Sequence, residues 1–162
     1  MAKTDYEKYV IREPIVKDPM GPILHVDAKT FPNFPVEMVI MGIHDPNLWG
    51  APPPHTHPAD EIFFFLGGNP KNFFEADFEA EIWLGEEGCR EKVVVNTPSV
   101  LYVPKGVLHC PFTFTKVSKP IFYGHILLHP IYESSKGGTD QTRTRPYTLE
   151  EKAKLRAGII VP

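Results

Sequence analysis

The segment PPPHTHPADE carries two histidines, His55 and His57, separated by one residue, and it ends on Glu61. On a β-strand, residues two apart point to the same side, so both imidazoles would meet at one point, and Glu61 has the same parity. A later segment, PKGVLH, turns the chain with a proline and a glycine and ends on His109. Three neutral imidazoles and a carboxylate suit iron, manganese, nickel, copper or zinc. The spacing therefore predicts a site for one divalent transition metal, with coordination positions left open for water, dioxygen or a substrate.

Prolines and glycines predict the elements that must position this site. The 18 prolines and 12 glycines are spread along the sequence and divide it into short segments, as in an all-β domain with many turns. The segment FEADFEAEIWLG alternates apolar and acidic residues, which predicts a buried face from Phe74 to Leu84 and a solvated face from Glu75 to Glu81. The expected strands cover residues 36–43, which we expect to be buried on both sides, and residues 61–66, 74–84, 93–95, 100–103, 109–117 and 121–129.

The two ends of the sequence differ from this central part. Residues 1–34 are polar and interrupted by prolines, so we expect an N-terminal arm that wraps a barrel or adds an edge strand to it. Residues 133–146 form a polar linker, and Thr148 and Glu151 then have the spacing of a capping box, which predicts a helix from Leu149 to Ala157. The interpretation is an all-β chain with a single domain over residues 1–162, a barrel core at about 36–129, and a C-terminal linker and helix at 133–162.

Composition and charge exclude several classes of protein. The formal net charge is -3 and no basic stripe is present, so no nucleic-acid partner is expected. The N-terminus is charged and no apolar run approaches the length of a bilayer span, so we expect no signal peptide, no membrane partner and a cytoplasmic location. Two cysteines, Cys89 and Cys110, are too few for a disulfide framework and are expected to be free thiols.

The segments that carry these histidines resemble the two motifs of the cupin superfamily, G-x5-HxH-x3,4-E-x6-G and G-x5-P-x-G-x2-H-x3-N. The matching residues are His55, His57, Glu61 and Gly68 in the first motif, and Pro104, Gly106 and His109 in the second. The departures are Gly50, which lies one residue nearer than the pattern asks, and Pro98 and Thr113, which stand where the second motif has its first glycine and its asparagine. The resemblance covers roughly residues 36–129, and the departures concern turns rather than ligands.

This resemblance implies a single jelly-roll β-barrel in which His55, His57, Glu61 and His109 bind the metal. It also implies an enzyme that acts on a small molecule inside the barrel, with a dioxygenase-type reaction as the first expectation. The alternatives are a redox-neutral lyase, isomerase or decarboxylase, in which Glu61 is ligand or base, a non-catalytic protein that binds a metal or small molecule, and a purely structural barrel. Small cupin barrels pair through sheet edges, so a homodimer is expected as well.

Further residues are candidates for catalysis. His125 shares a face with Tyr123 and His129 in the segment 121–129, and it could donate a hydrogen bond to a metal ligand or carry a proton. The alternative, which we prefer, is a buried histidine bonded to a backbone group. His129 is expected to be exposed. Tyr102 and Tyr123 could bind a substrate, although tyrosines in a β-core are usually packing groups.

Alternation also assigns residues to the cavity wall. Phe63 and Phe65 share the parity of Glu61 and are expected to face inward, as wall or core, while Phe64 faces outward. Cys110 directly follows a predicted ligand, so it should point away from the metal as a small core residue. The candidates for a gate at the cavity mouth are His44 and Trp49.

Overall fold

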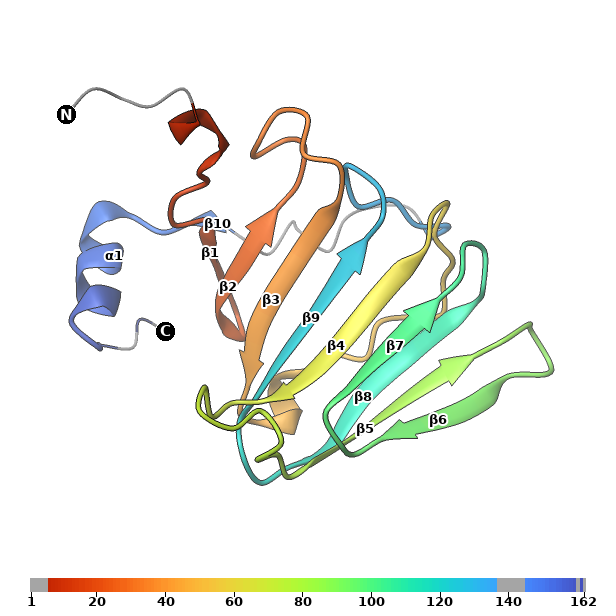
Figure 1. Cartoon of the computed structure of the whole chain (residues 1–162). Helices are drawn as coiled ribbons and strands as arrows, with labels where there is room; N and C mark the ends of the chain where they lie inside the picture. The colour runs from red at the N-terminus through yellow and green to blue at the C-terminus, as the bar shows by residue number, and fades with distance from the viewer. Residues whose placement is uncertain (1–5, 137–144, 160, 162) are drawn as a thin grey trace.

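In the computed structural model, which describes residues 6–136, 145–159 and 161, the chain folds into two antiparallel β-sheets and a short helix (Figure 1). One sheet has the strand order β10-β1-β2-β3-β9-β4-β7, and the other has the order β6-β5-β8. The strands are β1 (Ile15–Asp18), β2 (Gly21–Val26), β3 (Glu37–Ile43), β4 (Glu61–Gly67), β5 (Phe78–Leu84), β6 (Glu91–Val95), β7 (Ser99–Val103), β8 (His109–Val117), β9 (Ile121–Leu127) and β10 (Arg145–Pro146). The helices are α1 (Leu149–Arg156) and two short 3-10 helices, η1 (Glu7–Tyr9) and η2 (Pro46–Leu48). The predicted all-β barrel with a short C-terminal helix is confirmed.

The core lies between the two sheets. Phe63 and Phe65 of β4 and Tyr123 of β9 belong to the larger sheet, and Ile82 of β5 and Phe112 of β8 belong to the smaller one. All five side chains are at most 4% exposed. Burying a large apolar side chain stabilises a fold by about 1.5–3 kcal/mol. Packing of these inward faces therefore joins the two sheets into one jelly-roll barrel.

Strand β4 shows the alternation that the sequence predicts. Glu61, Phe63 and Phe65 are buried, while Ile62 and Phe64 on the opposite face are partly exposed. The inward position predicted for Phe63 and Phe65 and the outward position predicted for Phe64 are confirmed. Strand β4 lies between β9 and the edge strand β7, and the side chain of Glu61 enters the barrel from this end of the larger sheet.

Two predictions about strands are wrong. Strand β3 is not buried on both sides, because the outer face of the larger sheet is open: Glu37 and Val39 are buried, whereas Gly42 is exposed and Met38 is partly exposed. Strand β5 begins at Phe78, later than the alternation suggests, and Phe74 is 84% exposed. The preceding residues form a turn, in which the amide of Glu75 donates to the carbonyl of Asn72.

The N-terminal arm contributes more to the barrel than a single edge strand. It forms β1 and β2, which extend the larger sheet beyond β3, and β10 pairs with β1 at the far edge. The side chain of His25 in β2 is consequently buried. Of the predicted linker 133–146, residues 137–144 lie outside the described part of the chain.

The C-terminal helix begins as the sequence predicts. Thr148 Oγ1 accepts a hydrogen bond from the amide of Glu151, and the carboxylate of Glu151 accepts one from the amide of Thr148, so the capping box is confirmed. The helix ends at Arg156, one residue earlier than expected. Among the described residues, no helix has both the length and the apolar character needed to cross a membrane.

Candidate metal centre

His55 and His57 lie in the segment between η2 and β4, so the prediction that a strand presents them is wrong. His55 is held instead by an isolated bridge to His109, in which each backbone amide donates to the other's carbonyl at 3.0 Å. The three imidazoles still gather at one place. The ring centroids of His55 and His57 are 4.8 Å apart, those of His55 and His109 are 4.4 Å apart, and those of His57 and His109 are 5.0 Å apart.

The three rings share one pattern of hydrogen bonding. Each places Nδ1 beside a backbone carbonyl: Pro53 O for His55 (2.7 Å), Glu133 O for His57 (2.5 Å) and Val107 O for His109 (2.9 Å). A carbonyl only accepts, so we assign the proton of each neutral ring to Nδ1, which leaves the lone pair on Nε2. Metal-binding histidines typically make this kind of hydrogen bond with their other nitrogen, because it fixes the tautomer and the ring orientation.

The carboxylate of Glu61 lies among these nitrogens. Its Oε2 is 3.3 Å from His57 Nε2 and 3.2 Å from His109 Nε2. These three atoms are buried, and within the described part of the chain none of them has a hydrogen-bond partner. Leaving buried polar atoms unpaired costs about 1–3 kcal/mol each. A cation bound between them would remove this cost, so the donor set fits a divalent transition metal.

Burial and charge act in opposite directions on the pKa values at this centre. Burial raises the pKa of Glu61, but the contacts with His109 and His57 and the charge of His125 outweigh burial, so the pKa is well below its usual range. Burial lowers the pKa of His55, which favours the neutral ligand form. Burial also lowers the pKa of His57, but the Glu61 carboxylate reverses this and raises it overall. A metal must therefore compete with a proton at His57.

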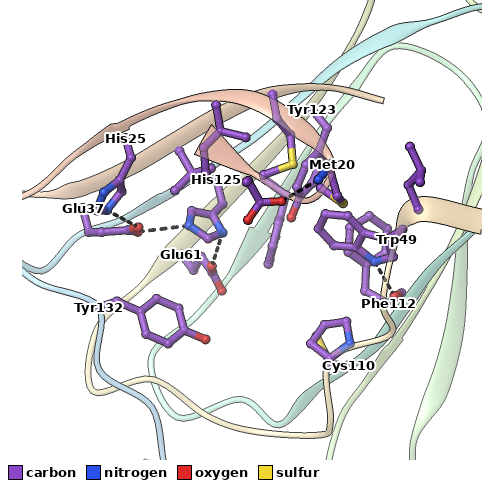
Figure 2. Close-up of a pocket in the computed structure, with 18 of the residues that line it drawn as sticks. Met20, His25, Glu37, Trp49, Glu61, Cys110, Phe112, Tyr123, His125 and Tyr132 are labelled. Carbon is purple, nitrogen blue, oxygen red and sulfur yellow. Dashed lines mark hydrogen bonds and ion pairs between the residues drawn. The ribbon is translucent and has the colours of Figure 1, made fainter. Parts of the chain in front are cut away.

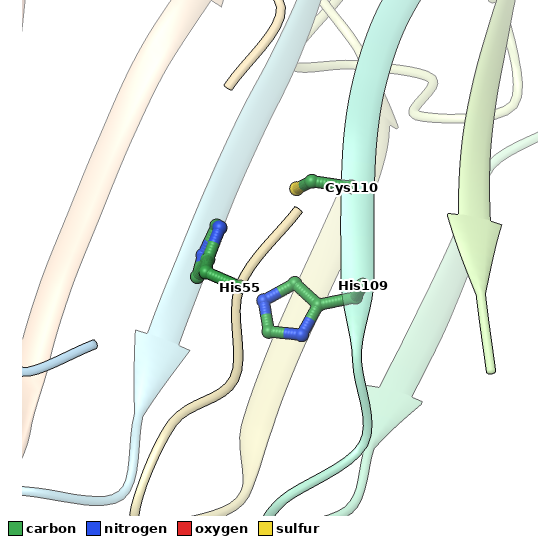
Figure 3. A group of neighbouring side chains, drawn as sticks. All are labelled: His55, His109 and Cys110. Atoms are coloured by element: carbon green, nitrogen blue, oxygen red, sulfur yellow. The ribbon is translucent and has the colours of Figure 1, made fainter. Parts of the chain in front are cut away.

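Two overlapping groups of side chains could hold an ion. In the first, the ligand atoms of His57, Glu61 and His109 all lie within 4.8 Å of one another. In the second, the same is true of His55, His109 and Cys110, which Figure 3 shows together. The structure thus places three of the four expected ligands in one group and His55 in the adjoining one.

Cys110 corrects a prediction, because it points toward the centre rather than away from it. Its backbone has a φ of 72°, and the pairing of β8 with β5 shifts register between Ile82 and Leu84. This irregularity breaks the alternation on which the prediction rested. Burial raises the pKa of the Cys110 thiol to about 12, so the free thiol stays protonated. Cys89 and Cys110 are both free, as predicted.

A cavity of about 210 Å³ adjoins the candidate ligands. Figure 2 shows its two sides: Trp49, Phe112 and Met20 lie on one, and Glu37, His125 and Glu61 lie on the other. The remaining lining residues are Asp18, Pro19, Ile23, His25, Val39, Met41, Leu48, Gly50, Pro52, His55, Phe63, Cys110, Tyr123 and Tyr132.

A row of histidine and glutamate side chains, buried except for the partly buried His125, runs along the inner face of the larger sheet. His25 Nε2 is 3.3 Å from Glu37 Oε1, Glu37 Oε2 is 3.0 Å from His125 Nε2, and His125 Nδ1 is 3.4 Å from Glu61 Oε1. These residues come from β2, β3, β9 and β4, which are consecutive in the sheet. His125 therefore contacts two carboxylates, and the preferred alternative of a backbone partner is wrong.

The pKa values of Glu37 and His125 are set by the contacts between their side chains and their neighbours. Burial by itself raises the pKa of Glu37, but His125 and His25 outweigh it and lower the pKa to about 2. Burial by itself lowers the pKa of His125, but Glu37 and Glu61 raise it to about 9. His125 is thus protonated at neutral pH and is held between two ionised carboxylates. Sequence reasoning missed His25 and Glu37, although a glutamate in the apolar strand 36–43 was a usable signal.

Tyr132 is a third residue that the sequence did not single out. It follows β9, and its ring packs against His57 and His125, with centroids 5.0 and 6.3 Å away. Its hydroxyl is 3.4 Å from His55 Nε2, the nitrogen expected to face a metal. Burial raises the pKa of the Tyr132 hydroxyl, so this group remains a donor. No sequence pattern near Tyr132 marked it.

The segment around Tyr132 also fastens the histidine segment. The amide of Ser135 donates to Thr56 O at 2.9 Å, and the amide of Thr56 donates to Ser135 Oγ at 3.0 Å. Together with Glu133 O, which holds His57, these bonds tie the chain after β9 to the chain before β4.

The other candidates divide between the cavity and the surface. Tyr102 is on the outer face, 54% exposed, with its hydroxyl donating to Asp60 Oδ2, so the structure places this candidate outside the cavity. Tyr123 is 2% exposed and lines the cavity. His129 is half-buried rather than exposed, and its Nδ1 lies beside Ile131 O. Of the expected gate residues, Trp49 lines the cavity, whereas His44 is exposed and does not.

Comparison with known proteins supports the fold. No protein-family model and no curated protein matches the sequence. Among solved structures, an oxalate decarboxylase from Lactobacillus farciminis in a formate complex aligns with a TM-score of 0.50 and 19% identity, over 71% of this chain and 30% of that one. Another oxalate decarboxylase structure aligns with a TM-score of 0.52 and 12% identity, over 83% of this chain and 37% of that one.

These neighbours are cupins, and the chain shares their fold. The chain spans about a third of the length of these two decarboxylases. Identity at this level establishes the fold alone, and the chemistry has to be argued from the site.

Proposed function

We propose that the protein is a metal-dependent enzyme that acts on a small molecule inside the barrel, with a dioxygenase-type reaction as the first candidate. The observation that carries this proposal is the set of buried Nε2 and carboxylate atoms that face one another without hydrogen-bond partners in the described structure. In this proposal His55, His57, Glu61 and His109 hold one divalent transition metal.

The surrounding residues suit a reaction in the adjoining cavity. A bound metal would supply a Lewis acid and, if it is redox-active, a path for electrons between a substrate and dioxygen. Trp49 and Phe112 would hold the apolar part of a substrate and exclude water. His125 holds a proton beside Glu61 Oε1, and the Tyr132 hydroxyl can donate to a group bound near His55.

A redox-neutral reaction, such as that of a lyase, isomerase or decarboxylase, is the second candidate. The observation that favours it is the presence of two proton-bearing groups, His125 and Tyr132, among the cavity-lining residues. General acid–base catalysis needs such groups within hydrogen-bond reach of the substrate. A non-catalytic protein that binds a metal or a small molecule would need neither of them.

Metal analysis tests the first step of the proposal. The wild-type protein loaded with Co²⁺ and dialysed should retain about one ion and show d–d absorption bands in the visible spectrum. His57→Ala and His109→Ala should each lose the ion and the bands, whereas His129→Ala should keep both, because His129 lies away from the cavity. Equal, trace metal in all four proteins would refute the metal site.

Oxygen consumption tests the reaction type. The Fe²⁺-loaded protein should consume dioxygen with at least one member of a panel of diols, thiols and keto acids if it is a dioxygenase. Turnover without dioxygen uptake would instead establish the redox-neutral alternative. Ligand-induced shifts in melting temperature without any turnover would leave the non-catalytic binding protein.

A further inference from the structure

The cavity is poorly suited to an anion. Among the described residues that line it there is no lysine and no arginine, whereas Asp18, Glu37 and Glu61 all contribute carboxylates. His125 lies between Glu37 and Glu61, with its two ring nitrogens 3.0 and 3.4 Å from their carboxylates, so both nitrogens already face acidic groups of the protein. A carboxylate group on a ligand in this cavity would therefore lie among three carboxylates with no lysine or arginine beside it, which is costly.

The opposite side of the cavity is lined by apolar side chains, and the one polar donor among them is already hydrogen-bonded within the protein. Trp49 packs edge-on against Phe112 and Tyr123, with centroids 5.0 and 5.1 Å away. Its single donor, Nε1, donates to Phe112 O at 2.8 Å and is not free for a ligand (Figure 2). Phe63 and Met20 line the cavity as well. This wall can contact a ring but offers it little hydrogen bonding.

The size of the cavity limits what the wall can contact. Its volume of about 210 Å³ is below the roughly 300–1,000 Å³ typical of pockets for drug-sized ligands. It exceeds the ~150 Å³ of an engineered apolar cavity that holds benzene. One six-membered ring with a small substituent therefore fits.

We propose that the cavity binds an uncharged single-ring molecule with one hydroxyl-bearing end, the ring against Trp49 and Phe112 and the hydroxyl toward Glu61 and the histidines. The inference rests on the proposed function only in placing the polar end beside a metal. It excludes small dicarboxylates such as oxalate as the preferred ligand.

Tryptophan fluorescence provides a direct test. The sequence has two tryptophans, and Trp83 is 37% exposed and absent from the cavity lining, so Trp83→Phe leaves Trp49 as the only reporter. The Zn²⁺-loaded variant, in which no redox turnover occurs, is titrated with benzyl alcohol and with benzoate, which have nearly the same size and differ in charge. We expect benzyl alcohol to change Trp49 emission saturably, benzoate to bind at least about tenfold more weakly, and oxalate to have no saturable effect. Benzoate or oxalate binding more tightly than benzyl alcohol would overturn the proposal, as would the absence of saturable benzyl alcohol binding.

A lysine placed inside the cavity can be compared with a lysine placed on the same strand outside it. Met41 on β3 lines the cavity and is partly exposed, whereas Met38 on the same strand has the opposite parity and does not line it. Met41→Lys should bind benzoate about tenfold or more tightly than the parent protein does, and Met38→Lys should keep the parental preference. Equal benzoate affinity in the two folded variants would overturn the argument from charge. The comparison of benzyl alcohol with benzoate in the parent protein decides the proposal if Met41→Lys does not fold.

Failure of this inference is distinguishable from failure of the proposed function. Metal retention is measured separately by metal analysis, and the titrations are repeated on the metal-free protein. Benzyl alcohol binding to a protein that retains no metal would refute the metal site and leave the ligand class standing. Metal retention with a preference for oxalate would refute the ligand class and leave the metal site standing.

Discussion

Replacing Glu37 by glutamine tests whether the buried ion pair with His125 stabilises the fold. Glu37 is 1% exposed, and its Oε2 lies 3.0 Å from His125 Nε2. The lowering of its pKa from 4.5 to about 2 corresponds to about 3 kcal/mol of stability at neutral pH. The raised pKa of His125 describes the same ion pair from the other partner, so the two shifts count once. Glutamine keeps the shape of the side chain and removes the charge.

The dependence on pH distinguishes this ion pair from packing. The folded pKa of Glu37 is below its unfolded value, so its contribution is present above about pH 4.5 and is lost as the pH falls through about 2. The folded pKa of His125 is above its unfolded value, so its contribution is present below about pH 6.5 and is lost as the pH rises through about 9. The difference between wild type and Glu37→Gln should therefore be largest between these limits, at about 3 kcal/mol near pH 6, and should fall to about 1 kcal/mol at pH 3.

Urea unfolding of the metal-free proteins at pH 3, 6 and 10 measures these differences. Glu75→Gln is the matched control, because Glu75 is exposed and pairs with Lys119 at the surface, so its removal should matter little at any of these pH values. A loss of stability in Glu37→Gln that is the same at all three pH values would show that shape, rather than charge, makes Glu37 important. No loss at pH 6 would refute the ion pair itself.

Three further outcomes test other parts of the structure. Gly124→Ala should lower the free energy of unfolding by about 1–3 kcal/mol, because an added Cβ would meet Val39 O at 2.5 Å, whereas Gly42→Ala meets nothing within 4 Å and should be neutral; urea unfolding of both compares them. Titration with a thiol reagent at pH 8 should find one reactive thiol in the folded protein, the exposed Cys89, and a second, Cys110, only after denaturation. The homodimer expected from the sequence stays a prediction, and a monomeric mass in sedimentation at micromolar concentration would contradict it.

The candidate ligands could be predicted because most of them lie close together in the sequence. His55, His57 and Glu61 lie within one short segment, and a proline and glycine turn marks His109, so spacing alone singled these residues out. His55 does not lie on a regular strand as predicted. Its backbone is held by the bridge to His109, and this bridge keeps its ring beside the other two imidazoles. The structure brings the side chains of these four residues together, but the local structure that spacing predicted for His55 and His57 is wrong.

The parts that could not be predicted depend on which strands become neighbours. Alternation states which face a side chain occupies, but it does not state that β2, β3, β9 and β4 lie side by side, and this order brings His25, Glu37, His125 and Glu61 together. Cys110 was misplaced for a different reason, since one irregular residue reverses the face of those after it.

The geometry of Glu61 bears on whether it acts as ligand or as base. Its Oε2 faces the Nε2 atoms of His57 and His109, while its Oε1 faces the imidazolium of His125. Both oxygens are therefore directed at other groups of the protein, and the low pKa of Glu61 makes it a weak proton acceptor at neutral pH. This arrangement supports the ligand role over that of a general base. If the reaction requires proton transfer, His125 and Tyr132 are better placed to carry it, because both line the cavity and both bear a proton at neutral pH.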